Sequence, residues 1–371
     1  MRYIYALFFL LCLFGCKRGV ISDTTLTDSS VKSEKLGSFG KNLIDTVVFE
    51  KFTVIPLETN TNNFIQRIER IIINNDLIYI FDKRLNKVCI YNDKGKQINY
   101  IHSVGQGPQE YISATDISID EETDDLLLLC DKPYKMMRYS SEGDFMEEIK
   151  YSEFYLEFSA VDNNIFCVLD DNTSEYEIAC SNLRLKMESK GLLSREDINK
   201  TCYDGGKYLV KSQNLIYSRR FDPCLYFIRD NSIEKRFEFD FGKYKIPTDI
   251  AYEEDCNKLV ELCKDRYIFS ITNVVESDKY IIFKTNLGIC LYEKESNKLS
   301  GYRSILNNSL EVGGNVYYPD NANGKSIIMC MQPSDLGYYS EEEIKSNSTL
   351  FDLSQKVKDD DNPILIVYEF K

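Results

Sequence analysis

The segment Gly105–Tyr111, with the sequence GQGPQEY, carries the residue types most suggestive of chemistry. Closely spaced glycines can wrap a phosphate group, but a nucleotide-binding loop needs a following helix with free amides and usually a lysine. Here Pro108 removes one amide, and strand-like sequence follows. We therefore predict a sharp structural turn, in which Gly105 and Gly107 adopt unusual φ angles and Pro108 fixes the exit of the chain.

The remaining candidates for catalysis or metal binding are few. His102 is the only histidine, so it cannot build a His-rich metal site, and no Gly-x-Ser-x-Gly elbow supports a serine triad through it. The acidic run Asp120–Asp125 has some calcium-loop character but lacks the glycine and the terminal glutamate of an EF-hand loop. We read this run, and Asp359–Asp361, as solvated turns. The sequence therefore predicts no catalytic residue, no metal site and no cofactor.

The twelve cysteines include no Cys-x-x-Cys pair, so neither a zinc knuckle nor a thioredoxin-like site is indicated. Cys256 and Cys263 are seven positions apart in a predicted helix, too far along its face to bond each other. Five others lie inside apolar, strand-like runs and are expected in the core. They are Cys89, Cys130, Cys167, Cys290 and Cys330.

Short apolar strands separated by turn residues dominate the chain. The stretch Leu77–Asp82 is followed by Lys87–Tyr91, a tight turn with Gly95, and a returning strand over Lys96–Ile101. A second copy begins at Asp125, a third begins at Tyr280, and weaker copies surround Cys167 and Cys224. Tyr91 and Tyr139 hold equivalent places 48 positions apart (139 − 91). This period favours β-propeller blades, with a β-sandwich as the alternative.

One segment departs from the strand pattern. Between Pro247 and Lys264 the apolar residues approach helical spacing, which predicts a helical insertion near 248–265 between two blades. Insertions in repeat folds often lie on the face used for binding, although a helix that only covers a blade edge has the same pattern.

The N-terminus has the features of an export signal. The apolar run Ile4–Phe14 is too short to span a bilayer. Together with Arg2, it matches a secretory signal peptide over residues 1–15. A buried N-terminal strand or helix is the alternative. Leu13–Cys16 resembles the lipobox of bacterial lipoproteins, which makes Cys16 the expected lipidation site and the membrane a partner. The polar residues 16–40 are expected to form a flexible tether.

Composition sets further limits on class. The formal net charge of −14 argues against nucleic-acid binding, which needs clustered Lys and Arg. The full chain has 43% hydrophobic residues, and the segment 41–371 is expected to form a single globular domain. Lys17 and Arg18 follow the expected lipidation site where an acidic segment would favour outer-surface display, so the membrane leaflet stays open.

Four segments in order along the chain carry a resemblance to a known family. They are Ile55–Thr59, Gly105–Tyr111, Phe239–Gly242 and Asn362–Tyr368. In these segments the chain resembles the six-bladed β-propeller lipoproteins of the Bacteroidetes, which are similar to NHL-type propellers. The resemblance implies an all-β fold of six antiparallel four-stranded blades. It also implies that an N-terminal strand pairs with the last strand, which leaves no open edge.

These features together suggest a cell-envelope lipoprotein, at the outer membrane or a periplasmic face, that binds a protein, peptide or glycan. Glu110 and Tyr111 are expected to be structural, with a position facing the central channel as the alternative. A propeller enzyme, such as a lyase or hydrolase with its site at the central channel, is the second hypothesis. A sensor module for a transport or signalling complex is the third.

Overall fold

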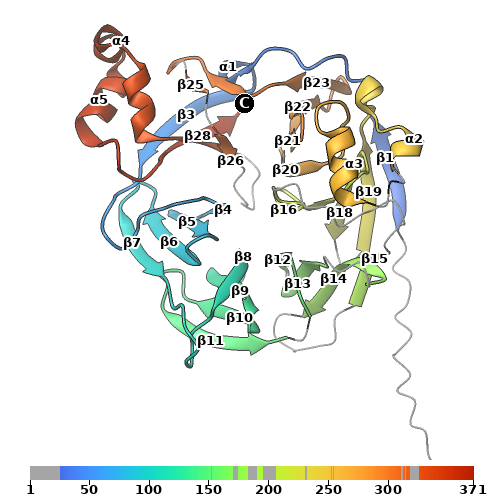
Figure 1. Cartoon of the computed structure of the whole chain (residues 1–371), viewed down its shortest axis with the longest axis horizontal. Helices are drawn as coiled ribbons and strands as arrows, with labels where there is room; N and C mark the ends of the chain where they lie inside the picture. Colours follow the sequence, from blue (N-terminus) through green and yellow to red (C-terminus); the bar gives the residue numbers. More distant parts are fainter. Residues whose placement is uncertain are drawn as a thin grey trace, which may run out of the picture.

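The computed structural model describes residues 26–151, 153–169, 174–182, 190–194, 206–229, 232–251, 253, 255–310, 312–313, 315–317 and 326–371. Six antiparallel sheets surround a common axis, so the fold is a six-bladed β-propeller (Figure 1). The fold class and the number of blades expected for this chain are confirmed.

Each blade is built on four strands, named here in order from the channel outward, and blade 4 gains a fifth from β1 (Thr27–Lys32). Blade 1 has β4 (Arg70–Asn74), β5 (Leu77–Asp82), β6 (Lys87–Asn92) and β7 (Gln97–Ile101). Blade 2 has β8 (Ser113–Asp120), β9 (Asp125–Lys132), β10 (Tyr134–Tyr139) and β11 (Phe145–Lys150). Blade 3 has β12 (Glu157–Val161), β13 (Asn164–Val168), β14 (Tyr176–Asn182) and β15 (Lys190–Ser194).

The second half of the chain repeats this plan. Blade 4 has β16 (Leu209–Lys211), β17 (Leu215–Ser218), β18 (Cys224–Arg229) and β19 (Ser232–Glu238). Blade 5 has β20 (Ile271–Glu276), β21 (Tyr280–Thr285), β22 (Gly288–Glu293) and β23 (Lys298–Tyr302). Blade 6 has β26 (Asn315–Tyr317), β27 (Ser326–Met331), β28 (Ile364–Phe370) and β3 (Phe49–Pro56).

Blade 6 joins the two ends of the propeller domain. Its outermost strand, β3, comes from the N-terminal part of the chain and pairs antiparallel with β28, from Ile364 opposite Pro56 to Phe370 opposite Phe49. An N-terminal strand therefore completes the last blade, as the resemblance implied. The ring has no open sheet edge at the point where the domain starts and ends.

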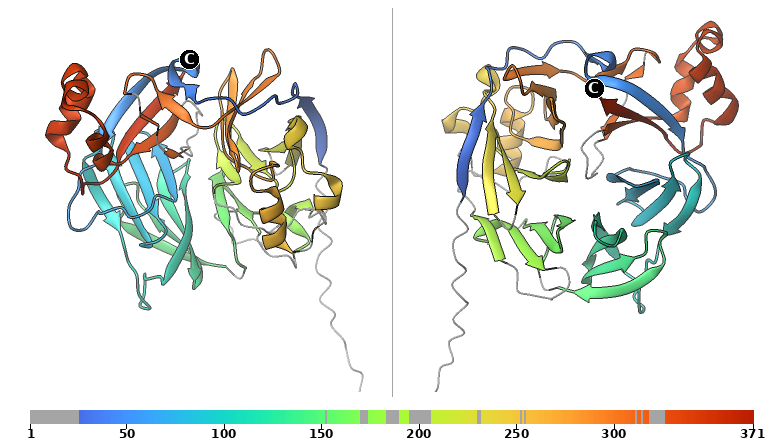
Figure 2. Two further views of the ribbon diagram at one scale, coloured as in Figure 1. Left: turned by 45° about the horizontal axis from the view of Figure 1, so that its top comes forward. Right: turned by 180° about the vertical axis from the view of Figure 1, so that it is seen from behind.

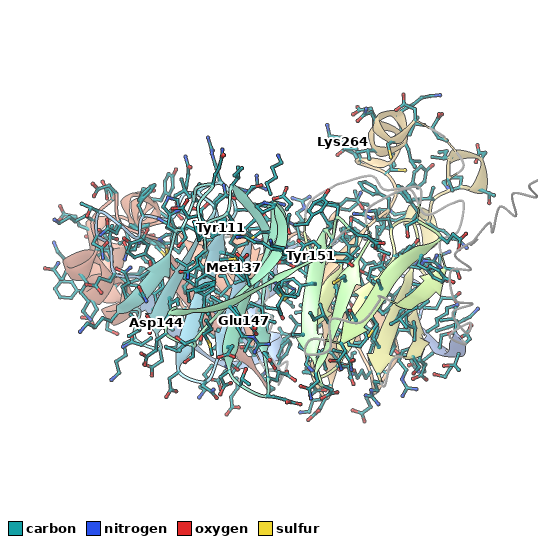
Figure 3. All side chains as sticks on the ribbon, turned by 90° about the horizontal axis from the view of Figure 1, so that it is seen from below. Tyr111, Met137, Asp144, Glu147, Tyr151 and Lys264 are labelled. Carbon is teal, nitrogen blue, oxygen red and sulfur yellow. The ribbon has the colours of Figure 1, made fainter. Side chains whose placement is uncertain are left out.

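The ring has two faces, which the chain direction distinguishes. We define the connection face as the face of the ring at which the last strand of each blade leads to the first strand of the next blade. The turns between the first two strands, and between the last two strands, lie at the opposite face. In an edge-on view, Lys264 projects beyond the connection face, whereas Asp144 lies toward the opposite face (Figure 3).

Side chains between neighbouring blades form the core. One cluster joins blades 1 and 2 through residues such as Tyr79, Tyr111 and Leu128, and similar clusters fill the other boundaries. The five cysteines expected in the core are buried and free. Cys256 is disulfide-bonded, whereas Cys263 is free, so these two do not bond each other.

The expected helical insertion is present as two helices rather than one. A short 3-10 turn η1 (Gly242–Tyr244) leads to α2 (Thr248–Ala251) and α3 (Cys256–Cys263) between blades 4 and 5. Asp255 caps α3 by accepting hydrogen bonds from the amides of Asn257 and Lys258, at 2.9 and 3.2 Å. A carboxylate at this position satisfies amides that have no partner within the helix.

A second helical segment was not expected from the sequence. Between β27 and β28 the chain forms η2 (Pro333–Tyr338), α4 (Glu341–Ser346) and α5 (Ser348–Lys356). These helices lie outside the ring beside blade 6 (Figure 1). Among the described residues, no helix is both long and apolar enough to cross a membrane.

The prediction of a flexible tether over residues 16–40 is wrong for its described part. Strand β1 (Thr27–Lys32) pairs parallel with β19 and makes blade 4 five-stranded (Figure 2). The chain then crosses the outside of blade 5, where Gly40 N donates to Gly301 O at 2.9 Å. It next forms β2 (Leu43–Ile44), which pairs with β24 (Ile305–Asn307), and α1 (Asp45–Val48). We call residues 27–40 the strap.

Two apolar side chains explain why the strap is ordered. Leu36 is only 2% exposed in the core between blades 4 and 5. The ring of Phe39 lies against Gly288 and Gly301, where a Cβ atom would approach it within 3.1 and 2.9 Å, respectively. Average polarity suggested a free linker, but two well-placed apolar side chains and one sheet edge are enough to hold this segment.

Candidate functional site

Four charged residues meet in the channel near the connection face. Arg70 begins β4, Asp116 lies in β8, Glu157 begins β12 and Lys207 precedes β16. The innermost strands of blades 1 to 4 therefore place these residues together, and each is at most 6% exposed. We call these residues the channel cluster.

Arg70 makes the most contacts in the cluster. Its Nη1 atom forms an ion pair with Asp116 and donates to the carbonyl oxygens of Ile117, at 3.2 Å, and Phe158, at 3.3 Å. Its Nη2 atom donates to the carbonyl oxygen of Leu209 at 3.0 Å. Blades 1 and 4 lie opposite each other in a ring of six. One guanidinium therefore bridges the channel and joins four blades.

Asp116 lies between two cations. Besides Arg70, Lys207 Nζ contacts its Oδ1 atom at 3.1 Å, and the amide of Phe158 donates to Oδ2 at 3.1 Å. Burial alone raises the pKa of Asp116, but Arg70 and Lys207 outweigh that effect and hold the pKa below its ordinary value. Burial in turn lowers the pKa of Lys207, but Asp116 and Glu157 reverse the effect and raise it.

Glu157 is the second carboxyl group of the cluster. Its Oε2 atom accepts hydrogen bonds from the amides of Tyr208 and Leu209, both at 2.9 Å, which ties blade 3 to blade 4. Burial raises the pKa of Glu157, and the nearby Asp116 charge adds to the effect, despite Lys207 and Arg70. An acid with a raised pKa beside two cations is a combination that enzymes also use.

The contacts of the cluster indicate its main chemical role. Every one of its charges is buried and bonded to another blade, so the side chains are already occupied by the protein itself. Buried ion pairs of this kind fix one arrangement of the strands that carry them. The cluster is therefore a structural lock across the channel, and a substrate would have to displace internal bonds to reach it.

Sequence reasoning missed the channel cluster. Its members belong to different blades, so no local motif contains two of them. The only available signal was a charged residue at or near the start of several apolar innermost strands, as in Arg70 before three isoleucines.

The Gly105–Tyr111 segment forms the turn that connects blades 1 and 2. Gly105 N donates to Tyr111 O at 2.9 Å, and Gly107 N donates to Glu110 Oε2 at 2.7 Å. The Tyr111 ring is fully buried between blades 1 and 2, and its hydroxyl donates to Asn86 O at 2.8 Å. Tyr111 therefore points into the inter-blade core rather than into the channel.

The expected φ angles of this turn need correction. Neither Gly105 nor Gly107 has a positive φ, whereas Gln109 does, at 63°. The glycines are needed for space, because a Cβ on Gly105 would lie 2.0 Å from Glu110 Oε2 and one on Gly107 would lie 3.0 Å from it. Pro108 is exposed within the turn.

The other sequence candidates lie apart from the channel cluster. His102 is exposed just after β7. The acidic run is a solvated turn only in its middle, where Glu121 and Glu122 are exposed. Asp120 and Asp125 at its ends are buried and bind Arg138 Nη1 at 3.0 and 2.8 Å. In the described part of the chain, no group of three or more His, Cys, Asp or Glu is placed to hold a metal ion. Cys16 lies outside the described residues.

Exposed apolar side chains form a second candidate site on the connection face. Phe64 is 50% exposed, Val104 and Ile112 are each 44% exposed, and Tyr134 is 40% exposed. Phe64, Val104 and Ile112 lie in connections at this end of blades 1 and 2, and Tyr134 begins β10 at the same end. At the opposite face, a surface hollow of about 290 Å³ lies between blades 3 and 4, with Phe166, Leu215 and Ile228 among its lining residues.

The whole propeller matches a family defined by its sequence. Residues 39–369 match a domain of unknown function, DUF4934. The chain belongs to the DUF4934 family. No curated protein matches the chain.

One solved structure supports the fold, and two others are similar to a lesser degree. This DUF4934 protein is similar to a "Putative exported protein" from Bacteroides fragilis NCTC 9343, with a TM-score of 0.70 and 16% identity over 93% of this chain and 100% of that one. A DUF4221 member from Bacteroides vulgatus ATCC 8482 gives a TM-score of 0.48 and 12% identity, covering 87% and 97%. A streptogramin B lyase gives a TM-score of 0.45 and 12% identity, covering 75% and 80%.

Proposed function

We propose that this DUF4934 protein is an exported, lipid-anchored protein of the bacterial cell envelope whose propeller binds a ligand or a partner protein. Export and anchoring are supported by the signal-like residues 1–15 and by Leu13–Cys16. The exported-protein name of the Bacteroides fragilis relative agrees with this location. The outer membrane and a periplasmic face are both suitable positions.

The ordered strap limits how far the propeller stands from the lipid. Cys16 lies only eleven positions before Thr27, where β1 begins (27 − 16). Fully extended, this length reaches at most about 40 Å. The propeller is thus held close to the membrane, where its partners have to meet it.

The distribution of exposed apolar side chains carries the proposal of binding. Phe64, Val104, Ile112 and Tyr134 lie on one face of the ring, and clusters of this kind on soluble domains mark interaction sites. The channel, in contrast, is bridged by Arg70. Exposed apolar side chains beside a bridged channel suit a protein surface or a peptide better than a small molecule enclosed by the ring.

Anchoring and binding are tested separately in the producing cells. Mass spectrometry of the mature N-terminus should find lipid on Cys16, and Cys16→Ser should leave the protein unlipidated. A photo-crosslinking residue at Ile112, on the connection face, should capture a defined partner. The same residue at Ile98, on the outer strand of blade 1, is the matched control. Equal labelling from both positions would argue against a binding site on the connection face.

A propeller enzyme with its site at the channel is the second candidate. The channel cluster favours it, since Glu157, Asp116 and two cations lie together there. Purified protein from residue 17 onward would then turn over a substrate, and Glu157→Gln would abolish turnover without unfolding the protein. Specific hydrolysis or elimination with these properties would replace the binding proposal.

A further inference from the structure

The hollow at the opposite face, between blades 3 and 4, has the size of a small-molecule site. Its volume of about 290 Å³ is close to the lower end of ligand pockets, which range over about 300–1,000 Å³. Its walls are the turn between β12 and β13, the turn between β16 and β17, and the end of β18. We call it the blade 3–4 hollow. A ligand that fits it has to be small.

The buried part of the lining is apolar and mainly aliphatic. Leu215 and Ile228 are 2% and 3% exposed, and Val161 is half-buried. Phe166 is the only aromatic residue among the described lining residues, and it is only 3% exposed. A sugar ring packs its C–H groups on the open face of an aromatic ring, and this lining offers none. The apolar part of the hollow therefore suits an aliphatic group.

Arg229 provides a positive charge on the blade 4 side of the hollow. It is exposed at the end of β18, and its Nε atom donates to Asn214 Oδ1 at 3.0 Å. Asn214 Nδ2 in turn donates to Glu276 Oε2 at 2.7 Å, and Lys294 balances the charge of Glu276 at 2.6 Å. Among the described residues, the Arg229 guanidinium forms no salt bridge. It is thus held in place by an uncharged amide and keeps donors for a ligand anion.

Asp162 provides a negative charge on the blade 3 side. It is exposed in the turn between β12 and β13, with a φ of 49°. Its carbonyl oxygen accepts a hydrogen bond from Asn164 Nδ2 at 3.0 Å, which stabilises the turn. Within the described ranges, no donor reaches its carboxylate. This carboxylate is therefore available to a ligand cation.

The remaining charges around the hollow have both signs. Lys211 lines the hollow and forms a salt bridge with Glu121 at 3.3 Å. Glu122 and Asp278 accept hydrogen bonds from neighbouring side-chain amides and keep their negative charges, so they oppose an anionic ligand. The cations Lys211 and Arg229 oppose a purely cationic ligand. Because like charges repel at close range, these groups favour a ligand that carries one charge of each sign.

We propose that the blade 3–4 hollow binds a small aliphatic amino acid or dipeptide. The ligand carboxylate pairs with Arg229, the ligand ammonium group pairs with Asp162, and the aliphatic side chain packs on Leu215 and Ile228. Charge-assisted hydrogen bonds of this kind are about twice as strong as neutral ones. This site is separate from binding on the connection face and goes beyond the proposed function.

Isothermal titration calorimetry with the purified protein from residue 17 onward tests the chemistry. The probes are L-leucine and leucyl-leucine, the C-terminal amide and the N-acetyl form of each, and N-acetylglucosamine. We expect leucine or leucyl-leucine to bind, and both blocked forms of that ligand to bind about tenfold more weakly or less, because each lacks one charge. Equal binding of blocked and unblocked forms, binding of the sugar alone, or no binding at millimolar concentration would overturn the proposal.

Single substitutions locate the two charges. Arg229→Gln should weaken binding of the unblocked ligand about tenfold or more but leave binding of its amide unchanged, because the amide has no carboxylate. Asp162→Asn should have the same effect on the unblocked ligand but leave binding of the N-acetyl form unchanged. Arg236→Gln on β19, and Asp76→Asn in the equivalent turn of blade 1, are matched exposed controls. Circular dichroism checks folding, and equal losses in the controls would overturn the placement.

The proposed function and this inference fail in different ways. If Ile112 captures a partner in cells but neither leucine nor leucyl-leucine binds, the connection face keeps its function and the assignment of the hollow is wrong. If the amino acid or dipeptide binds but no position on the connection face captures a partner, the hollow is a ligand site and binding by the connection face is contradicted.

Discussion

The Nη2 atom of Arg70 donates a 3.0 Å hydrogen bond to the carbonyl oxygen of Leu209, which belongs to the blade opposite its own. The two residues are 139 positions apart. The same guanidinium forms an ion pair with Asp116 of blade 2. A single side chain thus ties together strands whose own hydrogen bonds reach only their neighbours within a blade.

Replacing Arg70 should destabilise the whole ring. Arg70→Met removes the cation and leaves the carbonyl of Leu209 without its donor, so we expect a loss of about 3–5 kcal/mol in the free energy of unfolding. Arg67→Met is the control, because the Arg67 side chain is 65% exposed and its loss should change stability by less than about 0.5 kcal/mol. Denaturant unfolding measures the loss of stability in both variants. Similar losses for the two would contradict the structural role of Arg70.

Asp116 and Glu157 should influence the pH dependence of stability in opposite directions. The folded-state pKa of Asp116 is lowered, so its stabilising contribution is present above its unfolded pKa of about 3.9 and is lost as pH falls through the folded value. The folded-state pKa of Glu157 is raised. Its contribution is present below an unfolded pKa of about 4.3 and is lost as pH rises through the folded value.

Unfolding measurements across pH separate these two groups. The stability deficit of Asp116→Asn relative to the unmodified protein should shrink as the solution becomes acidic. The stability of the Glu157→Gln variant, relative to that of the unmodified protein, should be higher at pH 8 than at pH 4. Parallel curves for the two variants would contradict the assigned directions.

Gly105 should tolerate alanine only when Glu110 is shortened. A Cβ at Gly105 would displace the Glu110 carboxylate, which would then lose its bond to Gly107 N, at a cost of about 1 kcal/mol. In a Glu110→Ala background, Gly105→Ala should cost little. Gly37→Ala is the control, because a Cβ at Gly37 would have no atom within 4 Å. An equal cost in both backgrounds, from thermal melting, would show that the contact is unimportant.

The strap should contribute measurably to stability. Leu36→Ala removes a side chain buried between blades 4 and 5, so we expect a loss of about 2–5 kcal/mol. Val31→Ala lies on the same strap but is 40% exposed and should have little effect. Limited proteolysis should also cut the Leu36 variant before β2 sooner than the unmodified chain. Equal protease resistance would mean that Leu36 does not hold the strap.

Much of the fold was accessible from local pattern. The run Leu77–Asp82 is β5, the turn at Gly95 joins β6 to β7, and the copy starting at Asp125 belongs to the second blade. Alternating apolar residues and turn glycines act over a few residues, so sequence reveals them directly. The helical insertion near 248–265 and the buried cysteines followed from the same kind of pattern.

Features that depend on distant contacts were not accessible. The strap was predicted to be free because its composition is polar, but Leu36 finds its pocket only after blades 4 and 5 have formed. Gly105 was assigned an unusual φ, whereas its role is to leave room for the Glu110 carboxylate. Asp120 and Asp125 were read as solvated, although Arg138 from another strand neutralises them.

The strands, their turns, the repeating blade unit and the signal-like N-terminus could be predicted, because these features depend on residues close together in the chain. The closed ring sets which charges meet in the channel and which apolar side chains remain exposed on the connection face. Closing a ring brings Arg70 to Leu209 and Phe64 to the same surface as Tyr134. Such proximity exists only in the closed ring and cannot be predicted from any single segment.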